Sequence, residues 1–83
     1  MKHASAATLR GIEGLLAELR ALPGVTEKGV GKFYCKGSAL LHFHEDPAGL
    51  FADIKVDGEW IRRAVNSETA RARLVRDARR LLA

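Results

Sequence analysis

The sequence predicts an α+β fold, a two-layer sandwich of order α-β-β-β-β-α in which both helices cover one face of an antiparallel meander sheet. Apolar residues recur at helical spacing near both ends of the chain. Four short apolar and aromatic segments lie between them, separated by turn residues. With 83 residues, of which 47% are hydrophobic and 29% charged, we expect a single domain over residues 1–83.

A helix is expected at each end. The first covers residues 9–22, where leucines at helical spacing share one face. Ser5 or Thr8 can cap its start, and Pro23-Gly24 ends it. The last helix carries an apolar stripe over residues 70–82.

Four strands are expected between the helices, over residues 30–35, 39–44, 50–56 and 59–65. Asp57-Gly58 is the strongest turn signal, because a two-residue type I′ hairpin turn needs residues that tolerate positive φ. This turn sets the pairing of the last two strands, with Lys55 opposite Trp60 and Asp53 opposite Arg62.

The strand over residues 39–44 must place its apolar residues on the core face. The simplest register that does so puts His42 opposite Asp53 and His44 opposite Phe51. The other face of the sheet, which we call the open face, then carries Tyr34, His42, His44, Phe51, Asp53, Lys55, Trp60 and Arg62. Neither helix is expected to cover these residues, so they are the candidates for ligand binding or association.

His42 and His44 are the sharpest chemical feature of the open face. Residues i and i+2 of a strand point to the same side about 7 Å apart, within reach of one metal ion. Three interpretations stay open: a structural polar ladder of His42, Asp53 and Arg62, which we favour; a ligand-binding or acid–base role; and metal binding. Nothing in the sequence requires a cofactor, and zinc is the metal that this pair would bind.

An enzyme built on His42 and Asp53, with Arg62 holding an anionic substrate, is a further hypothesis. No nucleophile accompanies these residues, so the sequence favours a binding or interaction domain and assigns no catalytic residue. Cys35 is the only cysteine, which allows no intrachain disulfide and favours the cytoplasm. No apolar run approaches the ~20 residues of a membrane span, so we expect no membrane partner.

The net charge of +4 arises at the C-terminal end. Residues 1–58 hold seven basic and seven acidic side chains, whereas residues 59–83 hold seven arginines and three acidic side chains. Four of these arginines share the polar face of the last predicted helix: Arg73, Arg76, Arg79 and Arg80. Nucleic-acid binding is therefore an alternative function, although we favour a solvated helix face because no recognition motif accompanies the arginines.

Three of the aromatic residues lie on the open face: Tyr34, Phe51 and Trp60. Contiguous exposed aromatic side chains mark an interface or a ligand groove. For a chain of this length a symmetric homodimer is the expected partner arrangement.

Residues 22–56 contain a series of short motifs: Leu22-Pro23-Gly24-Val25-Thr26, Lys32-Phe33-Tyr34, and Leu41-His42-Phe43-His44 followed by Asp53. In these motifs the chain resembles short bacterial proteins labelled luciferase-domain proteins, which share a PGV start, an H-x-H strand and a downstream aspartate. That label implies no light-producing activity. The start is also similar to that of YjbR-like proteins, which are small α+β domains. The resemblance implies that His42, His44 and Asp53 are the positions that matter, and it implies no reaction.

Overall fold

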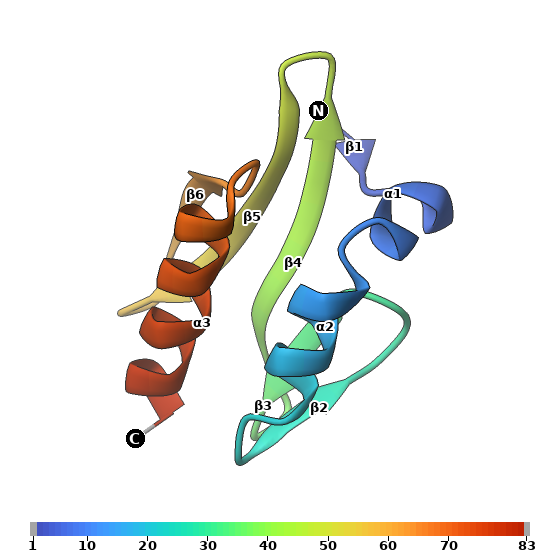
Figure 1. Ribbon diagram of the computed structural model, residues 1–83. Coiled ribbons are helices and arrows are strands. Elements are labelled where there is room, and N and C mark those ends of the chain that lie inside the picture. Colours follow the sequence, from blue (N-terminus) through green and yellow to red (C-terminus); the bar gives the residue numbers. More distant parts are fainter. Residues whose placement is uncertain (1, 83) are drawn as a thin grey trace.

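The computed structural model describes residues 2–82. Three helices are present in this range: α1 (Ala6–Arg10), α2 (Glu13–Arg20) and α3 (Glu68–Leu82). The strands are β1 (Lys2–His3), β2 (Val25–Glu27), β3 (Lys32–Cys35), β4 (Ser38–Asp46), β5 (Gly49–Val56) and β6 (Glu59–Ala64). Figure 1 shows their arrangement along the chain.

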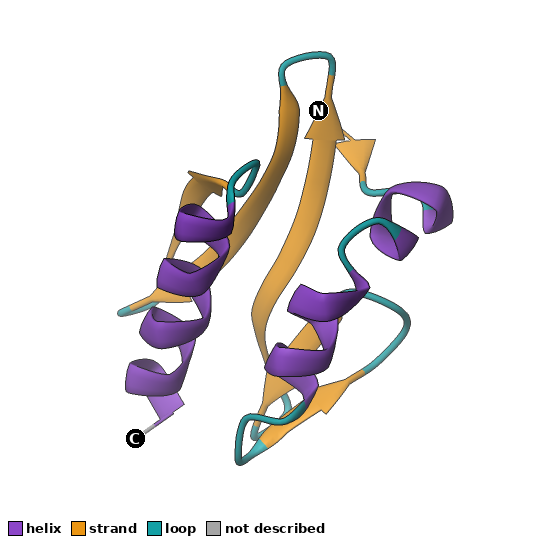
Figure 2. Ribbon diagram, in the orientation of Figure 1, coloured by secondary structure: helices purple, strands orange, loops and turns teal. Residues whose placement is uncertain are grey.

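The strands form one antiparallel sheet in the order β2-β3-β4-β5-β6, with β1 added alongside β4. The long helices α2 and α3 lie on the same side of this sheet (Figure 2). The α+β meander predicted from the sequence is confirmed. Among the described residues, no helix is both long enough and apolar enough to cross a membrane.

The predicted register of the central hairpins is also confirmed. His42 pairs with Asp53 and His44 with Phe51 across β4 and β5. Asp53 pairs with Arg62 across β5 and β6. The turn between these strands has φ of 52° at Asp57 and 82° at Gly58, the left-handed conformation that a type I′ turn requires.

The core fills the space between the sheet and the helices. Its most deeply buried large side chains are Leu16, Leu19, Phe33, Leu41, Ile54, Val65 and Leu74. Arg63 falls on this side by strand alternation, opposite Ala52. Because β6 is an edge strand, the Arg63 guanidinium can reach Asp77 of α3, with which it forms an ion pair.

The N-terminal third differs from the prediction. The expected helix over residues 9–22 is divided at Gly11 and Ile12 into α1 and α2. Glycine inside a helix costs about 1 kcal/mol relative to alanine, which favours a break at that point. The expected strand over residues 30–35 begins only at Lys32, because Gly29 and Gly31 adopt positive φ in the preceding turn.

Two strands were not predicted. β2 has three residues and β1 has two, so neither is long enough to show an alternating pattern. β1 pairs with His44 and Glu45 of β4, whereas β3 pairs with residues 38–42 of the same strand. Since β5 pairs along one edge of β4, β3 and β1 share the opposite edge, where they pair with successive segments of β4.

Candidate metal centre

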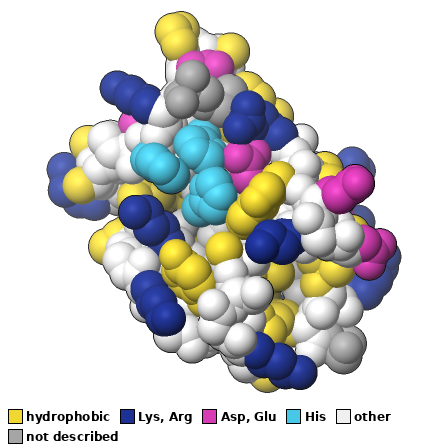
Figure 3. All heavy atoms as spheres, turned by 180° about the vertical axis from the view of Figure 1, so that it is seen from behind, with side chains coloured by type: hydrophobic (Ala, Val, Ile, Leu, Met, Phe, Trp, Pro, Cys, Tyr) yellow, Lys and Arg dark blue, Asp and Glu magenta, His cyan; other side chains and the backbone are white. Residues whose placement is uncertain are grey.

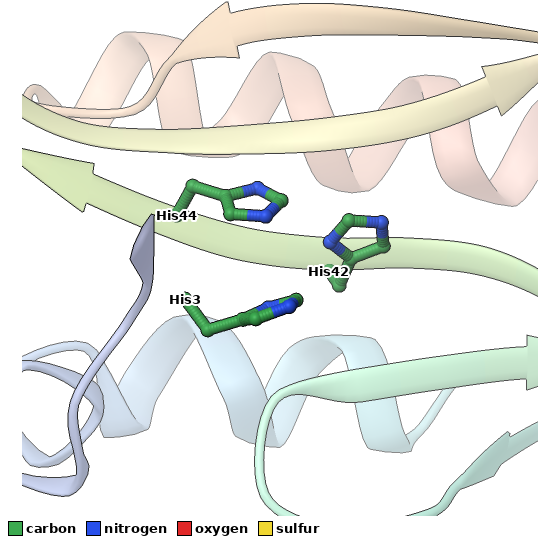
Figure 4. A group of neighbouring side chains, drawn as sticks. All are labelled: His3, His42 and His44. Carbon is green, nitrogen blue, oxygen red and sulfur yellow. The ribbon is translucent and has the colours of Figure 1, made fainter. Parts of the chain in front are cut away.

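Three histidines converge on the open face of the sheet. His42 and His44 project from β4 to the same side, and β1 brings His3 next to them because His3 is the strand partner of His44. One ring nitrogen of each residue lies within 4.8 Å of the corresponding nitrogens of the other two. Figure 4 shows the three rings facing one another in front of β4. The ring centroids of His3 and His44 are 4.6 Å apart, and those of His42 and His44 are 4.7 Å apart.

The position of His3 depends on contacts made by the residues that follow it. The backbone N–H of Ala4 donates to the carbonyl of Phe43 at 3.1 Å. The Glu45 carboxylate accepts from the backbone N–H of Ser5 at 2.6 Å and from the Thr8 hydroxyl at 2.7 Å. Ser5 also caps the start of α1. Glu45 therefore ties β1 and α1 to β4 and holds His3 at the cluster.

Burial keeps the two β4 histidines neutral. Removal from water is the largest cause that lowers the pKa of His42, and the neighbouring His44 imidazole lowers it further. Burial also lowers the pKa of His44, outweighing the nearby Asp53 carboxylate, which acts in the opposite direction. Neutral imidazoles at physiological pH have a free lone pair, which a metal ligand needs.

Two buried nitrogens of the cluster have no hydrogen-bond partner within residues 2–82: the Nδ1 atoms of His42 and His44. Oδ2 of Asp53 lies 3.0 Å from Nδ1 of His44, but the pair does not meet the geometry of a hydrogen bond. A buried polar atom without a partner costs about 1–3 kcal/mol. The cluster therefore carries an energetic cost that a bound ion and small ring rotations would remove.

Asp53 itself is fully engaged with Arg62. Its side chain is buried, and its two oxygens accept from Nε of Arg62 at 2.8 Å and from Nη2 at 2.9 Å. These hydrogen bonds are the largest cause that lowers the pKa of Asp53, so the group stays a carboxylate. The sequence suggested Asp53 as a partner of His42, in a polar ladder or in an acid–base pair. In the structure its carboxylate faces His44 and Arg62 instead.

The geometry suits an open tetrahedral site. Zinc–nitrogen bonds of about 2.0–2.1 Å place the ligand nitrogens of a tetrahedral ion about 3.4 Å apart. Side-chain movements of about 1 Å would shorten the observed nitrogen–nitrogen separations of up to 4.8 Å to that value. His3 is exposed and free to make such a movement. Three imidazole ligands leave a fourth position for water or a ligand.

The remaining predicted residues of the open face surround this cluster. Figure 3 shows the histidines as one patch with acidic and basic side chains beside it. The rings of Trp60 and His42 lie in an edge-to-face arrangement with centroids 4.7 Å apart, and the Lys55 ammonium lies 4.9 Å from the centre of the Trp60 ring. Tyr34 lies on β3 under the Lys28 ammonium, and Phe51 is the strand partner of His44.

The arginines of the last helix lie elsewhere. All four candidates are exposed on α3: Arg73, Arg76, Arg79 and Arg80. α3 covers the other face of the sheet (Figure 1), so these arginines lie on a surface separate from the histidine cluster.

His3 is the site residue that sequence reasoning missed. The first residues show no strand periodicity, and the only available signal was that the chain has three histidines in all. No protein-family model, curated protein or solved structure matches this chain, so the resemblance noted for residues 22–56 stays a prediction.

Proposed function

We propose that this protein is a small metal-binding domain that holds one divalent transition-metal ion, with zinc as our candidate, on His3, His42 and His44. The observation that carries the proposal is the convergence of three imidazoles from two strands, with ligand nitrogens within 4.8 Å of one another. Imidazole is a ligand that suits zinc, nickel and copper, whereas carboxylate and carbonyl oxygens suit magnesium and calcium.

Asp53 and Arg62 complete the arrangement as outer groups. A metal-bound histidine commonly directs its other ring nitrogen toward a carboxylate, which fixes the ring and strengthens its lone pair. Asp53 lies 3.0 Å from Nδ1 of His44, so a small rotation of the ring would let Nδ1 donate to this carboxylate and leave Nε2 for the ion. Arg62 orients the carboxylate through its two hydrogen bonds.

Zinc titration of protein without a histidine tag tests the proposal. After chelator treatment and dialysis, calorimetry is expected to show one zinc ion per chain near neutral pH. His3→Ala and His44→Ala should each weaken zinc binding by about 10-fold or more. Lys2→Ala is the matched control, because it alters the same short strand without removing a ligand. Absence of zinc binding, or equal binding by the wild type and both histidine variants, refutes the proposal.

Association of two copies is the expected partner arrangement. Trp60 and Ile61 are 44% and 40% exposed on β6, which is an edge strand of the sheet. Exposed apolar side chains on a free edge support pairing with a second chain. A cytoplasmic location and nucleic-acid binding through the arginines of α3 stay predictions from the sequence.

A further inference from the structure

A pocket of about 230 Å³ opens beside the histidine cluster. His3 and His42 form part of its wall, and Lys32, Tyr34 and Ala39 line it from β3 and the start of β4. Lys32 is the strand partner of His42 on the β3 side, whereas Asp53 is its partner on the β5 side. The pocket and the Asp53–Arg62 pair therefore lie on opposite sides of His42.

We propose that the fourth coordination position of the metal opens into this pocket and binds a small organic carboxylate. This inference rests on the metal site proposed above and specifies what that site takes up. The carboxylate would coordinate the ion, and its short carbon chain would lie against Tyr34 and Ala39.

The neighbouring acidic side chains are already engaged, so they leave the fourth position free. Asp53 accepts two hydrogen bonds from Arg62. Glu45 accepts from Ser5 and Thr8 at the start of α1. On the β5–β6 side, the Trp60 ring packs against His42 with centroids 4.7 Å apart. The open position consequently faces the pocket.

The charge of the pocket selects an anion. Because metal-bound imidazole carries no charge, a divalent ion on the three histidines keeps its full charge of two, and none of the described residues that line the pocket is acidic. Lys32 adds a positive charge to the lining, and the Lys28 ammonium lies 5.0 Å from the centre of the Tyr34 ring. An anionic ligand would balance these charges.

The size and lining of the pocket restrict that anion further. Pockets for drug-sized ligands measure about 300–1,000 Å³, so the 230 Å³ available here suits a smaller molecule. The Tyr34 ring and the Ala39 methyl group offer nonpolar surface, which favours a short aliphatic carboxylate over a fully hydrated inorganic anion.

Cobalt(II) provides the test, because its visible absorption bands respond to a change of ligand. Tag-free protein loaded with Co²⁺ is titrated with acetate, butyrate and inorganic phosphate. We expect saturable spectral changes with the carboxylates and tighter binding of butyrate than of acetate or phosphate. Lys32→Gln should weaken butyrate binding about two- to fivefold, as expected for an exposed charge pair, without reducing Co²⁺ affinity. Lys55→Gln, on the far side of His42 beside Trp60, should leave butyrate binding unchanged.

The outcomes separate the two proposals. A chain that binds no Co²⁺ refutes the metal site itself. If Co²⁺ binds, the carboxylate inference is overturned by an unchanged spectrum, by phosphate binding more tightly than butyrate, or by equal effects of Lys32→Gln and Lys55→Gln.

Discussion

The contact between Asp53 and Arg62 provides the sharpest prediction about the stability of the site. Asp53 is only 6% exposed, and its two oxygens receive guanidinium hydrogen bonds of 2.8 and 2.9 Å. Asp53→Asn removes the charge and turns one acceptor into an NH₂ group that faces a donor of Arg62. The substitution preserves the size of the side chain, so any loss reports on charge and hydrogen bonding.

The expected loss of unfolding free energy follows from these contacts. A hydrogen bond to a charged group contributes about 1.5–3 kcal/mol. The Arg62 side chain is 49% exposed and remains hydrated in the variant, so the loss should equal about one such bond, ~2 kcal/mol. For a domain of this size, that loss lowers the melting temperature by about 8–16 °C.

The pH dependence gives the prediction a second readout. Because Arg62 lowers the folded-state pKa of Asp53, the stabilisation is complete above the unfolded-state value of about 3.9. It is lost as the pH falls through the lower folded-state pKa. The difference between wild type and Asp53→Asn should therefore be full at pH 7 and shrink below about pH 4.

Urea unfolding followed by circular dichroism, with chelator present, measures this difference. Asp57→Asn is the matched control, since Asp57 is exposed in the hairpin turn and asparagine adopts its positive φ equally well. That control should remain within about 0.5 kcal/mol of wild type. The reasoning is refuted if Asp53→Asn unfolds like the control at pH 7, or if its deficit persists unchanged at acid pH.

Three further predictions concern the cluster and its surroundings. Glu45→Gln should weaken zinc binding, measured by calorimetry, several-fold, because Glu45 holds the segment that carries His3. The control Glu59→Gln should leave the zinc affinity unchanged, and equal affinities of Glu45→Gln and wild type would contradict this role. Burial lowers the pKa of His42 and of His44, so near and below pH 6.5 the unfolded chain binds more protons than the folded chain. The free energy of unfolding of the metal-free protein should therefore fall from pH 7 to pH 5, and urea unfolding that is independent of pH over this range would contradict this prediction. Light scattering should show a dimer that Trp60→Ala weakens, and a monomeric wild type would end the dimer hypothesis.

Most of the sheet could be predicted from local patterns. Alternation along residues 39–44 and 50–56, together with the Asp57-Gly58 turn, was sufficient for the pairing of β4, β5 and β6. Shifting a strand by one residue would move its apolar side chains to the wrong face, so burial of one face specifies the register. The division of the first helix at Gly11 was missed, because the leucine periodicity continues across the break.

The sequence by itself determined that His42, His44 and Asp53 share one face of the sheet, because side chains alternate with a period of two along a strand. Only the tertiary structure decided that His3 joins them. A two-residue strand has no periodicity of its own, and its place depends on contacts with Glu45 and Phe43, far along the chain. Tertiary packing likewise directed the Asp53 carboxylate toward His44 and Arg62, since strand pairing specifies which residues are opposite and side-chain packing specifies which atoms meet.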